Sequence, residues 1–209
     1  MWLYKFIDIP SLPSELEAKV TALYQNPDKE HLRINNNSYA DAMRPELSGK
    51  LHPKDVVAVR NGKSYRNSRA SRYRLEQDVY DWIHKHLTDQ YTDCGLSVIA
   101  ALDGLLAPHS DQTRKFAILY TFETGGPDVR TVYYQEQDHP VERELRTFGT
   151  DYGRLTEIHS VQFPLRKWVL MNTNILHSVE NLVTDRVQIQ FGVNTIPTAW
   201  SYNYINEIQ

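Results

Sequence analysis

Apolar residues recur with helical spacing at two places in the first half of the chain. Ser14 followed three residues later by Glu17 has the arrangement of a capping box, and the apolar positions after it predict a helix from Ser14 to Gln25. A longer amphipathic pattern predicts a second helix from Arg74 to Asp89. Its apolar positions are Leu75, Val79, Trp82, Ile83 and Leu87.

Short runs rich in β-branched and aromatic residues dominate the chain after Cys94, and Gly, Pro, Asn and Asp separate them. This change of pattern predicts a mainly β fold with flanking helices, a β-sandwich or jelly roll. We expect one domain over residues 1–209, with a helix-rich supporting part over 1–94 and the β core over 95–195. The expected strands are "HLRINN", "DVVAVR", "GLSVIAAL", "KFAILYTF", "VRTVYYQ", "EIHSVQF", "KWVLMN" and "RVQIQFGVN".

Composition narrows the class of protein. The chain has 209 residues and a formal net charge of -3, which makes a dedicated nucleic-acid binder the least favoured class. Its one cysteine excludes an intrachain disulfide and a zinc site built from cysteines. No signal peptide and no run long enough to span a bilayer is visible, so we expect a cytoplasmic protein without membrane partners. The oligomeric state cannot be read from the sequence.

The triplet H-x-D at His109 and Asp111 stands just before an apolar run and has two readings. It is common enough by chance to be an ordinary polar turn. His177 follows another apolar run, and strands far apart in sequence become neighbours in a jelly roll. Two imidazoles and one carboxylate that meet at one end of the jelly roll would form the facial triad of non-haem Fe(II) sites. That triad holds the iron and leaves positions open for other ligands.

Arg186 stands nine residues after His177 and opens the alternating run "RVQIQFGVN". A buried guanidinium there would bind a carboxylate through two parallel hydrogen bonds, which lysine cannot reproduce. A surface arginine at the start of a strand is the alternative.

The order H-x-D, apolar strand, Gly-Gly turn, strand, "LHSVEN" and "DR" resembles the 2-oxoglutarate and Fe(II)-dependent dioxygenase superfamily. The resemblance covers Gly95 to Asn194, roughly half of the chain. Within the superfamily, "HSVEN" followed by "DR" is similar to the prolyl and aspartyl/asparaginyl hydroxylase branches. It implies a double-stranded β-helix, which is a jelly-roll core. It also implies a hydroxylase that converts 2-oxoglutarate and O2 to succinate and CO2 while it oxidises its substrate.

The resemblance also implies roles for individual residues. His109, Asp111 and His177 would bind Fe(II), and Arg186 would pair with the distal carboxylate of 2-oxoglutarate. Tyr120 stands where some members place a hydroxyl on that carboxylate, although a core aromatic is an equal reading. Gln188 replaces the Ser or Thr that many members have two residues after the arginine, and it could still donate a hydrogen bond.

Two alternatives remain open at this level. A cupin-like metal-binding jelly roll without 2-oxoglutarate chemistry would not need Arg186. The basic stretch from Arg60 to Arg74 holds six Arg and Lys residues and no acidic residue. Such a stretch is usually a solvated loop, and the alternative is a lid that recognises an anionic substrate.

Overall fold

The computed structural model describes residues 1–26, 32–35, 56–60, 63–66, 69–101, 104–111, 114–137, 150–197, 200 and 202–207. Its helices are α1 (Ser14–Gln25) and α3 (Gln77–His86), with a short 3-10 turn, η3, at Tyr152–Arg154. The strands in the first half are β1 (Trp2–Ile7), β2 (Leu32–Asn35), β3 (Val56–Arg60), β4 (Lys63–Arg66), β5 (Arg69–Tyr73), β6 (Asp93–Ala100) and β7 (Leu105–His109). Those in the second half are β8 (Phe116–Glu123), β9 (Arg130–Glu136), β10 (Thr150–Asp151), β11 (Leu155–Val161), β12 (Trp168–Asn172), β13 (His177–Glu180), β14 (Arg186–Val193) and β15 (Tyr202–Glu207).

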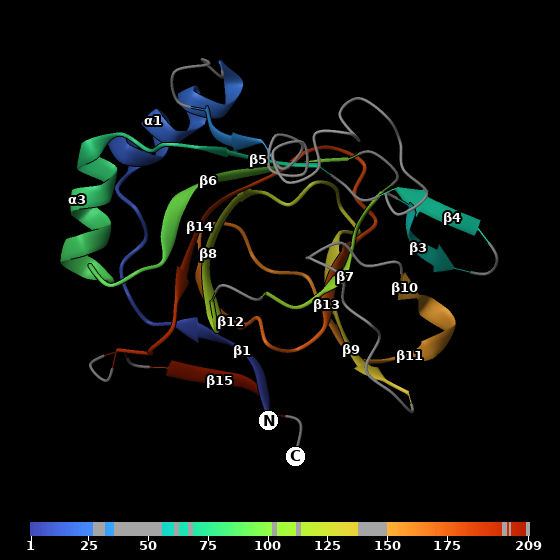
Figure 1. The fold of residues 1–209 in the computed structure, drawn as a ribbon. Helices are drawn as coiled ribbons and strands as arrows, with labels where there is room; N and C mark the ends of the chain where they lie inside the picture. Colours follow the sequence, from blue (N-terminus) through green and yellow to red (C-terminus); the bar gives the residue numbers. More distant parts are fainter. Residues whose placement is uncertain are drawn as a thin grey trace.

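Two antiparallel sheets form the body of the molecule (Figure 1). The large sheet has the order β15-β1-β12-β8-β14-β6-β5-β2, and the small sheet has the order β11-β9-β13-β7. From β6 to β14 the chain passes back and forth between them, with β6, β8, β12 and β14 in the large sheet and β7, β9, β11 and β13 in the small one. This alternation is the topology of a jelly roll, so the expected mainly β, double-stranded β-helix fold is confirmed. A third sheet has the order β10-β3-β4.

The large sheet is wider than the sequence predicts, because the N-terminal part adds strands to it. β1 pairs with β12, and β5 pairs with β6. The "WLYKFI" run of β1 was not expected as a strand, and β5 lies in the basic stretch that was expected as a loop. The first 94 residues therefore supply strands of the large sheet as well as helices.

The two predicted helices are present, but the predicted capping box is wrong. α1 covers Ser14–Gln25 as expected, yet its N-cap is Pro13 and no side chain caps it. Glu17 instead accepts hydrogen bonds from the Tyr120 hydroxyl and from the guanidinium of Arg166. The Glu17 side chain therefore makes long-range contacts and does not cap the N-terminus of α1.

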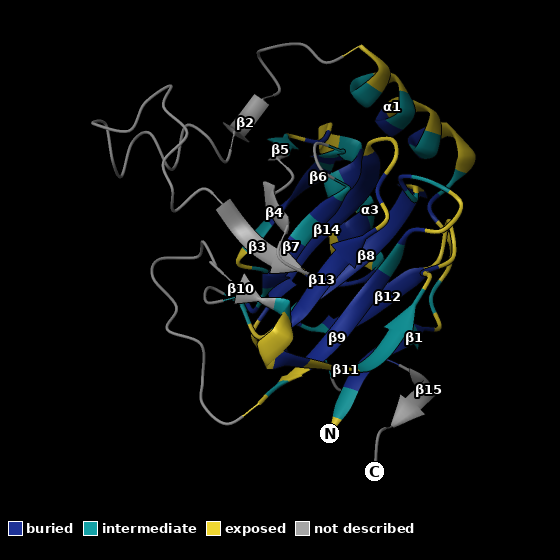
Figure 2. Ribbon diagram, turned by 90° about the vertical axis from the view of Figure 1, so that its right-hand side faces the viewer, coloured by how far each residue is buried: buried dark blue, intermediate teal, exposed yellow. Residues whose placement is uncertain are grey.

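Two apolar layers hold the sheets and helices together. The first lies between the large sheet and α1 and α3, and the second lies between the two sheets (Figure 1). The central strands on both sides of the second layer, β8 and β14 in the large sheet and β9 and β13 in the small one, are mostly buried (Figure 2). Its members include Leu3, Tyr4, Leu119, Tyr133 and Phe163, and the ring of Tyr4 stacks on that of Tyr133. The side chains that point into this inter-sheet layer form the site described below.

The Gly-Gly turn connects the two sheets and does not close a hairpin. It joins β8 of the large sheet to β9 of the small sheet. Gly125 has φ of 93°, and a Cβ atom there would lie 2.5 Å from Leu182 Cδ2 and 3.3 Å from Arg186 Cβ. The glycine is needed because a side chain would collide with the segment that leads into β14.

Among the described residues, no helix is both long enough and apolar enough to cross a membrane.

Candidate metal centre

Three aromatic side chains form a row across the inner face of the small sheet. His177 of β13 is the register partner of His109 on β7 and of Tyr133 on β9. Register partners share a face of the sheet, so all three rings point the same way. The ring centroids of His109 and His177 are 4.4 Å apart, and those of His177 and Tyr133 are 6.3 Å apart.

Both histidines are held by the same backbone contact. Nδ1 of His109 lies 2.7 Å from the carbonyl oxygen of Ala107, and Nδ1 of His177 lies 2.8 Å from that of Ile175. A carbonyl oxygen can only accept, so each Nδ1 carries a proton, and a neutral ring then has its lone pair on Nε2. A hydrogen bond from the non-ligating nitrogen is what orients histidines that bind metals.

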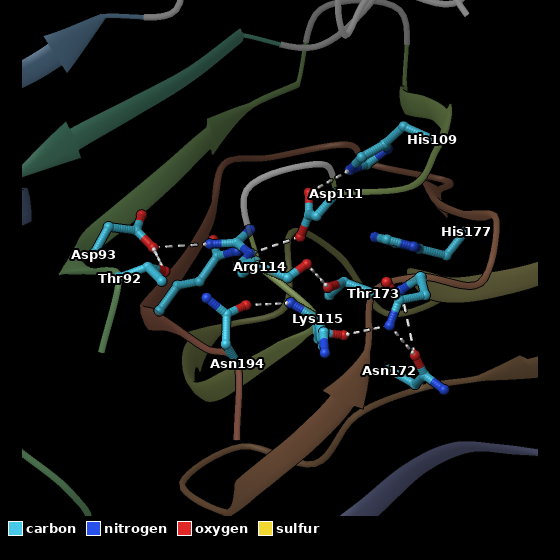
Figure 3. Close-up of polar contacts among 12 residues, drawn as sticks. Thr92, Asp93, His109, Asp111, Arg114, Lys115, Asn172, Thr173, His177 and Asn194 are labelled. Carbon is cyan, nitrogen blue, oxygen red and sulfur yellow. Dashed lines mark hydrogen bonds and ion pairs between the residues drawn. The ribbon is translucent and has the colours of Figure 1, made fainter. Parts of the chain in front are cut away.

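Asp111 follows β7 and faces the two rings (Figure 3). Its backbone N–H donates to the carbonyl oxygen of Thr173 at 2.9 Å. Its Oδ1 is 3.9 Å from Nε2 of His109, and its Oδ2 accepts a hydrogen bond of 2.6 Å from Nε of Arg114. The structure therefore places His109 next to Asp111 and next to His177, the other two residues that the sequence nominated as ligands.

The charges of this cluster suit a site for a cation. Burial would raise the pKa of the Asp111 carboxyl, but Arg114 and the two histidines outweigh burial and bring that pKa down to about 2. Burial, with a smaller contribution from His109, lowers the pKa of His177 to about 3. At neutral pH Asp111 is therefore an anion and His177 a neutral imidazole, the protonation states that metal binding requires.

Within the part of the chain that the structure describes, no group of three or more His, Cys, Asp and Glu side chains is already arranged to hold a metal ion. His109 lies close to Asp111 and to His177, and Oδ2 of Asp111 accepts a hydrogen bond from Arg114. The assignment of these residues as metal ligands is therefore a proposal and is argued as one below.

Arg186 is a buried cation at the other end of the same interior. Its side chain is 4% exposed, and no carboxylate among the described residues lies within ion-pair distance of it. Its Nε donates to Oε1 of Gln188 at 3.0 Å, and its Nη1 lies 3.5 Å from Oγ1 of Thr131. Burial lowers the pKa of Arg186 to about 10, so it is charged at neutral pH.

Strand β9 sets the separation between Arg186 and the histidines. Thr131, which contacts Arg186, and Tyr133, which lies beside His177, are two residues apart on that strand. Residues two apart on a strand share a face and are separated by about 7 Å. The guanidinium of Arg186 and the two imidazoles therefore stand side by side in one interior.

Tyr133 is the residue of this interior that sequence reasoning missed. Its hydroxyl is buried and has no hydrogen-bond partner among the described residues. Burial, with a smaller contribution from Tyr4, raises the pKa of this phenol well above its usual value, while Arg186 opposes the rise. The sequence offered one available signal, since Tyr133 has the same alternation phase as Thr131 in "VRTVYYQ".

The structure places Tyr120 in the apolar core, which is one of the two readings that the sequence left open. It is the register partner of Ile189 and packs in the layer under α1 and α3, where its hydroxyl donates to Glu17. Arg186 and Gln188 alternate with Ile189 along β14 and point to the opposite face. The side chain of Tyr120 therefore lies across the sheet from Arg186. Gln188 does lie beside Arg186, as an acceptor from the guanidinium.

Only part of the basic stretch falls on residues whose side chains are described. Arg72 is an ion-pair partner of Asp93 at 3.4 Å and also contacts the carbonyl oxygen of Gln190, so it belongs to the sheet. Arg74 is exposed. The side chains of Arg60, Lys63, Arg66 and Arg69 lie outside the described residues, and the expectation of a lid is untested there.

Comparison with known proteins adds one likeness in overall fold. No protein-family model matches the chain, and no curated protein matches it. Among solved structures, the chain is similar to an oxidoreductase of the 2OG-Fe(II) oxygenase family from Burkholderia pseudomallei. That similarity covers 88% of this chain and 96% of the other, with 10% sequence identity and a TM-score of 0.40. At these values the likeness assigns no role to any residue, and the proposals below rest on this chain's own side chains.

Proposed function

We propose that this protein is an Fe(II)- and 2-oxoglutarate-dependent oxygenase that hydroxylates its substrate. The observation that carries the proposal is the buried guanidinium of Arg186, which lacks a carboxylate partner among the described residues and shares an interior with two oriented histidines. A buried charge without a counter-ion costs stability, so its presence favours a ligand that supplies the missing carboxylate.

The residues present fit an iron ion. His109 and His177 would hold it through Nε2, and Asp111 would hold it through a carboxylate oxygen, because each Nδ1 is already bonded to the backbone. Two imidazoles and one carboxylate are the donor set that non-haem Fe(II) takes when it must keep positions open. When bound, the iron would supply the activation of dioxygen that accompanies conversion of 2-oxoglutarate to succinate and CO2.

The chain's own residues bind and orient the cosubstrate. In the proposal Arg186 pairs with the distal carboxylate of 2-oxoglutarate, and the Tyr133 hydroxyl donates to the same group. Gln188 accepts from Nε of Arg186 and so fixes the plane of the guanidinium. The buried walls of the inter-sheet layer, among them Phe163 below the guanidinium, exclude water and strengthen these charged hydrogen bonds.

Anaerobic titration of the Fe(II)-loaded protein with 2-oxoglutarate tests the proposal. Chelation of iron by the keto acid gives a metal-to-ligand charge-transfer band in visible light, and we expect this band in the wild-type protein. Replacing Arg186 by Met should raise the dissociation constant of 2-oxoglutarate by roughly 30-fold or more, since loss of a buried charge pair costs about 2 kcal/mol or more. The exposed Arg154 provides the control, and Arg154→Met should leave the constant unchanged.

A wild-type protein that binds Fe(II) without a charge-transfer band would contradict the oxygenase proposal. That result would favour the cupin-like alternative, a jelly roll that binds metal without 2-oxoglutarate chemistry. The substrate itself is best sought by following succinate release over a compound library. An anionic substrate remains part of the proposal because of the basic stretch, in which Arg74 is an exposed cation.

A further inference from the structure

Arg114 connects the candidate metal centre to strands β6 and β5 of the large sheet. Its Nε donates to Oδ2 of Asp111 at 2.6 Å, and its Nη1 lies 3.4 Å from Oδ1 of Asp93. Oδ2 of Asp93 in turn lies 3.4 Å from Nη1 of Arg72. Opposite charges therefore alternate along a chain from β5 to the candidate ligand (Figure 3 shows its Asp93–Arg114–Asp111 part). Arg114 is 10% exposed in its side chain, and both of its carboxylate contacts are within the molecule.

A glycine on β14 makes room for this arginine. A Cβ atom at Gly192 would lie 2.6 Å from Cδ of Arg114, 2.5 Å from Oγ1 of Thr92 and 2.9 Å from Oδ1 of Asp93. These distances are too short for real contacts, so any other residue at 192 would push the Arg114 side chain aside. Strand β14 thus contributes to the interior at both ends. Arg186 stands at its start, and Gly192 near its end leaves room for the Arg114 side chain.

The contact with Arg114 makes the two oxygens of Asp111 unequal. Oδ2 is bonded to the guanidinium, while Oδ1 is the oxygen on the side of His109. The Asp111 backbone is fixed as well, through its bond to the carbonyl oxygen of Thr173. A carboxylate held at the backbone and at one oxygen has only the other oxygen to offer a metal ion.

We propose that Arg114 is a positioning residue that makes Asp111 bind iron through Oδ1 alone. This inference rests on the proposed function, because it concerns the same metal centre. A carboxylate that is free to turn can bind a metal through both oxygens, and the second oxygen would occupy a position that the facial triad leaves open. Arg114 therefore preserves the positions on the metal that 2-oxoglutarate and dioxygen need.

Counting the exchangeable waters on the Mn(II)-loaded protein tests this role. Mn(II) suits the same N and O ligands, and water-proton relaxation reports how many metal-bound waters exchange. Replacing Arg114 by Met removes the donor to Oδ2 while keeping a side chain of similar length. We expect fewer exchangeable waters per bound Mn(II) in this variant, because the second oxygen of Asp111 displaces water. An equal or larger number of waters would overturn the inference.

A second variant reaches the same contact without altering either charged residue. Gly192→Ala displaces the Arg114 side chain, and we expect it to lower the number of exchangeable waters in the same direction. It also guards against a folding defect in Arg114→Met, and thermal unfolding of both proteins identifies such a defect. Arg154→Met, which removes an exposed arginine, should match the wild type.

The result separates the two proposals. Wild-type protein that binds no Mn(II) and no Fe(II) contradicts the metal centre itself. Wild-type protein that binds Mn(II) with the same number of exchangeable waters as both variants contradicts only the role of Arg114.

Discussion

At the scale of single residues, the buried Tyr120 of β8 and the buried Tyr133 of β9 differ in what their hydroxyls contact. The Tyr120 hydroxyl donates to Glu17, whereas the Tyr133 hydroxyl has no partner among the described residues. A buried polar group without a partner costs free energy of folding, and a ligand that bonds to it offsets this cost. This contrast makes Tyr133, and not Tyr120, the aromatic residue that we assign to the cosubstrate.

Phenylalanine substitutions of the two tyrosines should therefore affect different properties, ligand binding in one case and stability in the other. Tyr133→Phe should weaken 2-oxoglutarate binding by roughly 10-fold or more without lowering the free energy of unfolding, because the lost hydrogen bond forms only with the charged ligand. Tyr120→Phe should lower the free energy of unfolding by about 1–2 kcal/mol and leave 2-oxoglutarate binding unchanged. Urea unfolding and calorimetric titration measure the two quantities. Equal effects of both substitutions on binding would contradict this division of roles.

The sequence shows the chemistry of the site but not its geometry. His109, Asp111, His177 and Arg186 could be nominated because their residue types are rare in this order. Arg114 and Tyr133 could not, because an arginine near an aspartate and a tyrosine in a strand occur in most proteins. Their importance follows from burial and from contacts with residues distant in the chain, which residue type does not indicate.

At the scale of elements, the long runs with a β composition were predictable, and the short strands β7 and β13 were not. β14 and β8 have eight residues each and a clear β composition. β7 has the sequence "LLAPH" with a proline, and β13 has the sequence "HSVE" with polar residues at three of four positions. The two strands that carry the histidines thus lack a strong β pattern. Pairing with β9 and burial in the sandwich stabilise β13 in spite of its composition.

The turn between β8 and β9 links stability to the proposed binding of 2-oxoglutarate. Gly125→Ala should lower the free energy of unfolding by about 1–3 kcal/mol, because φ of 93° disfavours a side chain and the new methyl group would meet Leu182. It should also weaken 2-oxoglutarate binding, since the same methyl group would press on Arg186. Urea unfolding and ligand titration of the variant check both effects. Gly153→Ala, at an exposed glycine, is the matched control and should change neither.

At the scale of the whole molecule, buried titratable groups at the centre of the sandwich make stability depend on pH. His177 has a pKa of about 3 in the folded protein, compared with an ordinary value of 6.5 in the unfolded chain. The unfolded chain therefore binds more protons between these pH values, and folding stability falls as the pH is lowered through this range. Above pH 6.5 the contribution of His177 is fully present.

Urea unfolding of the metal-free protein between about pH 7 and pH 4 should show this loss. The slope of the unfolding free energy against pH should be smaller in His177→Gln, because that variant removes a group whose protonation differs between the two states. His84, which lies on α3 and contacts Tyr91, provides the control, and His84→Gln should retain the wild-type slope. A wild-type slope in His177→Gln would contradict the assignment.

The row formed by His109, His177 and Tyr133 has a consequence for how the protein reaches its native state. These residues come from three strands that are distant in sequence and are aligned only by the pairing of β7, β13 and β9. A slip of β13 by one residue would turn His177 outward and bring Ser178 inward, because side chains alternate along a strand. Metal affinity would then report on strand registration, and a misregistered chain would be recognised by its failure to bind the ion. Refolding followed by metal uptake could therefore distinguish correctly closed molecules from compact ones that have the right secondary structure and the wrong pairing.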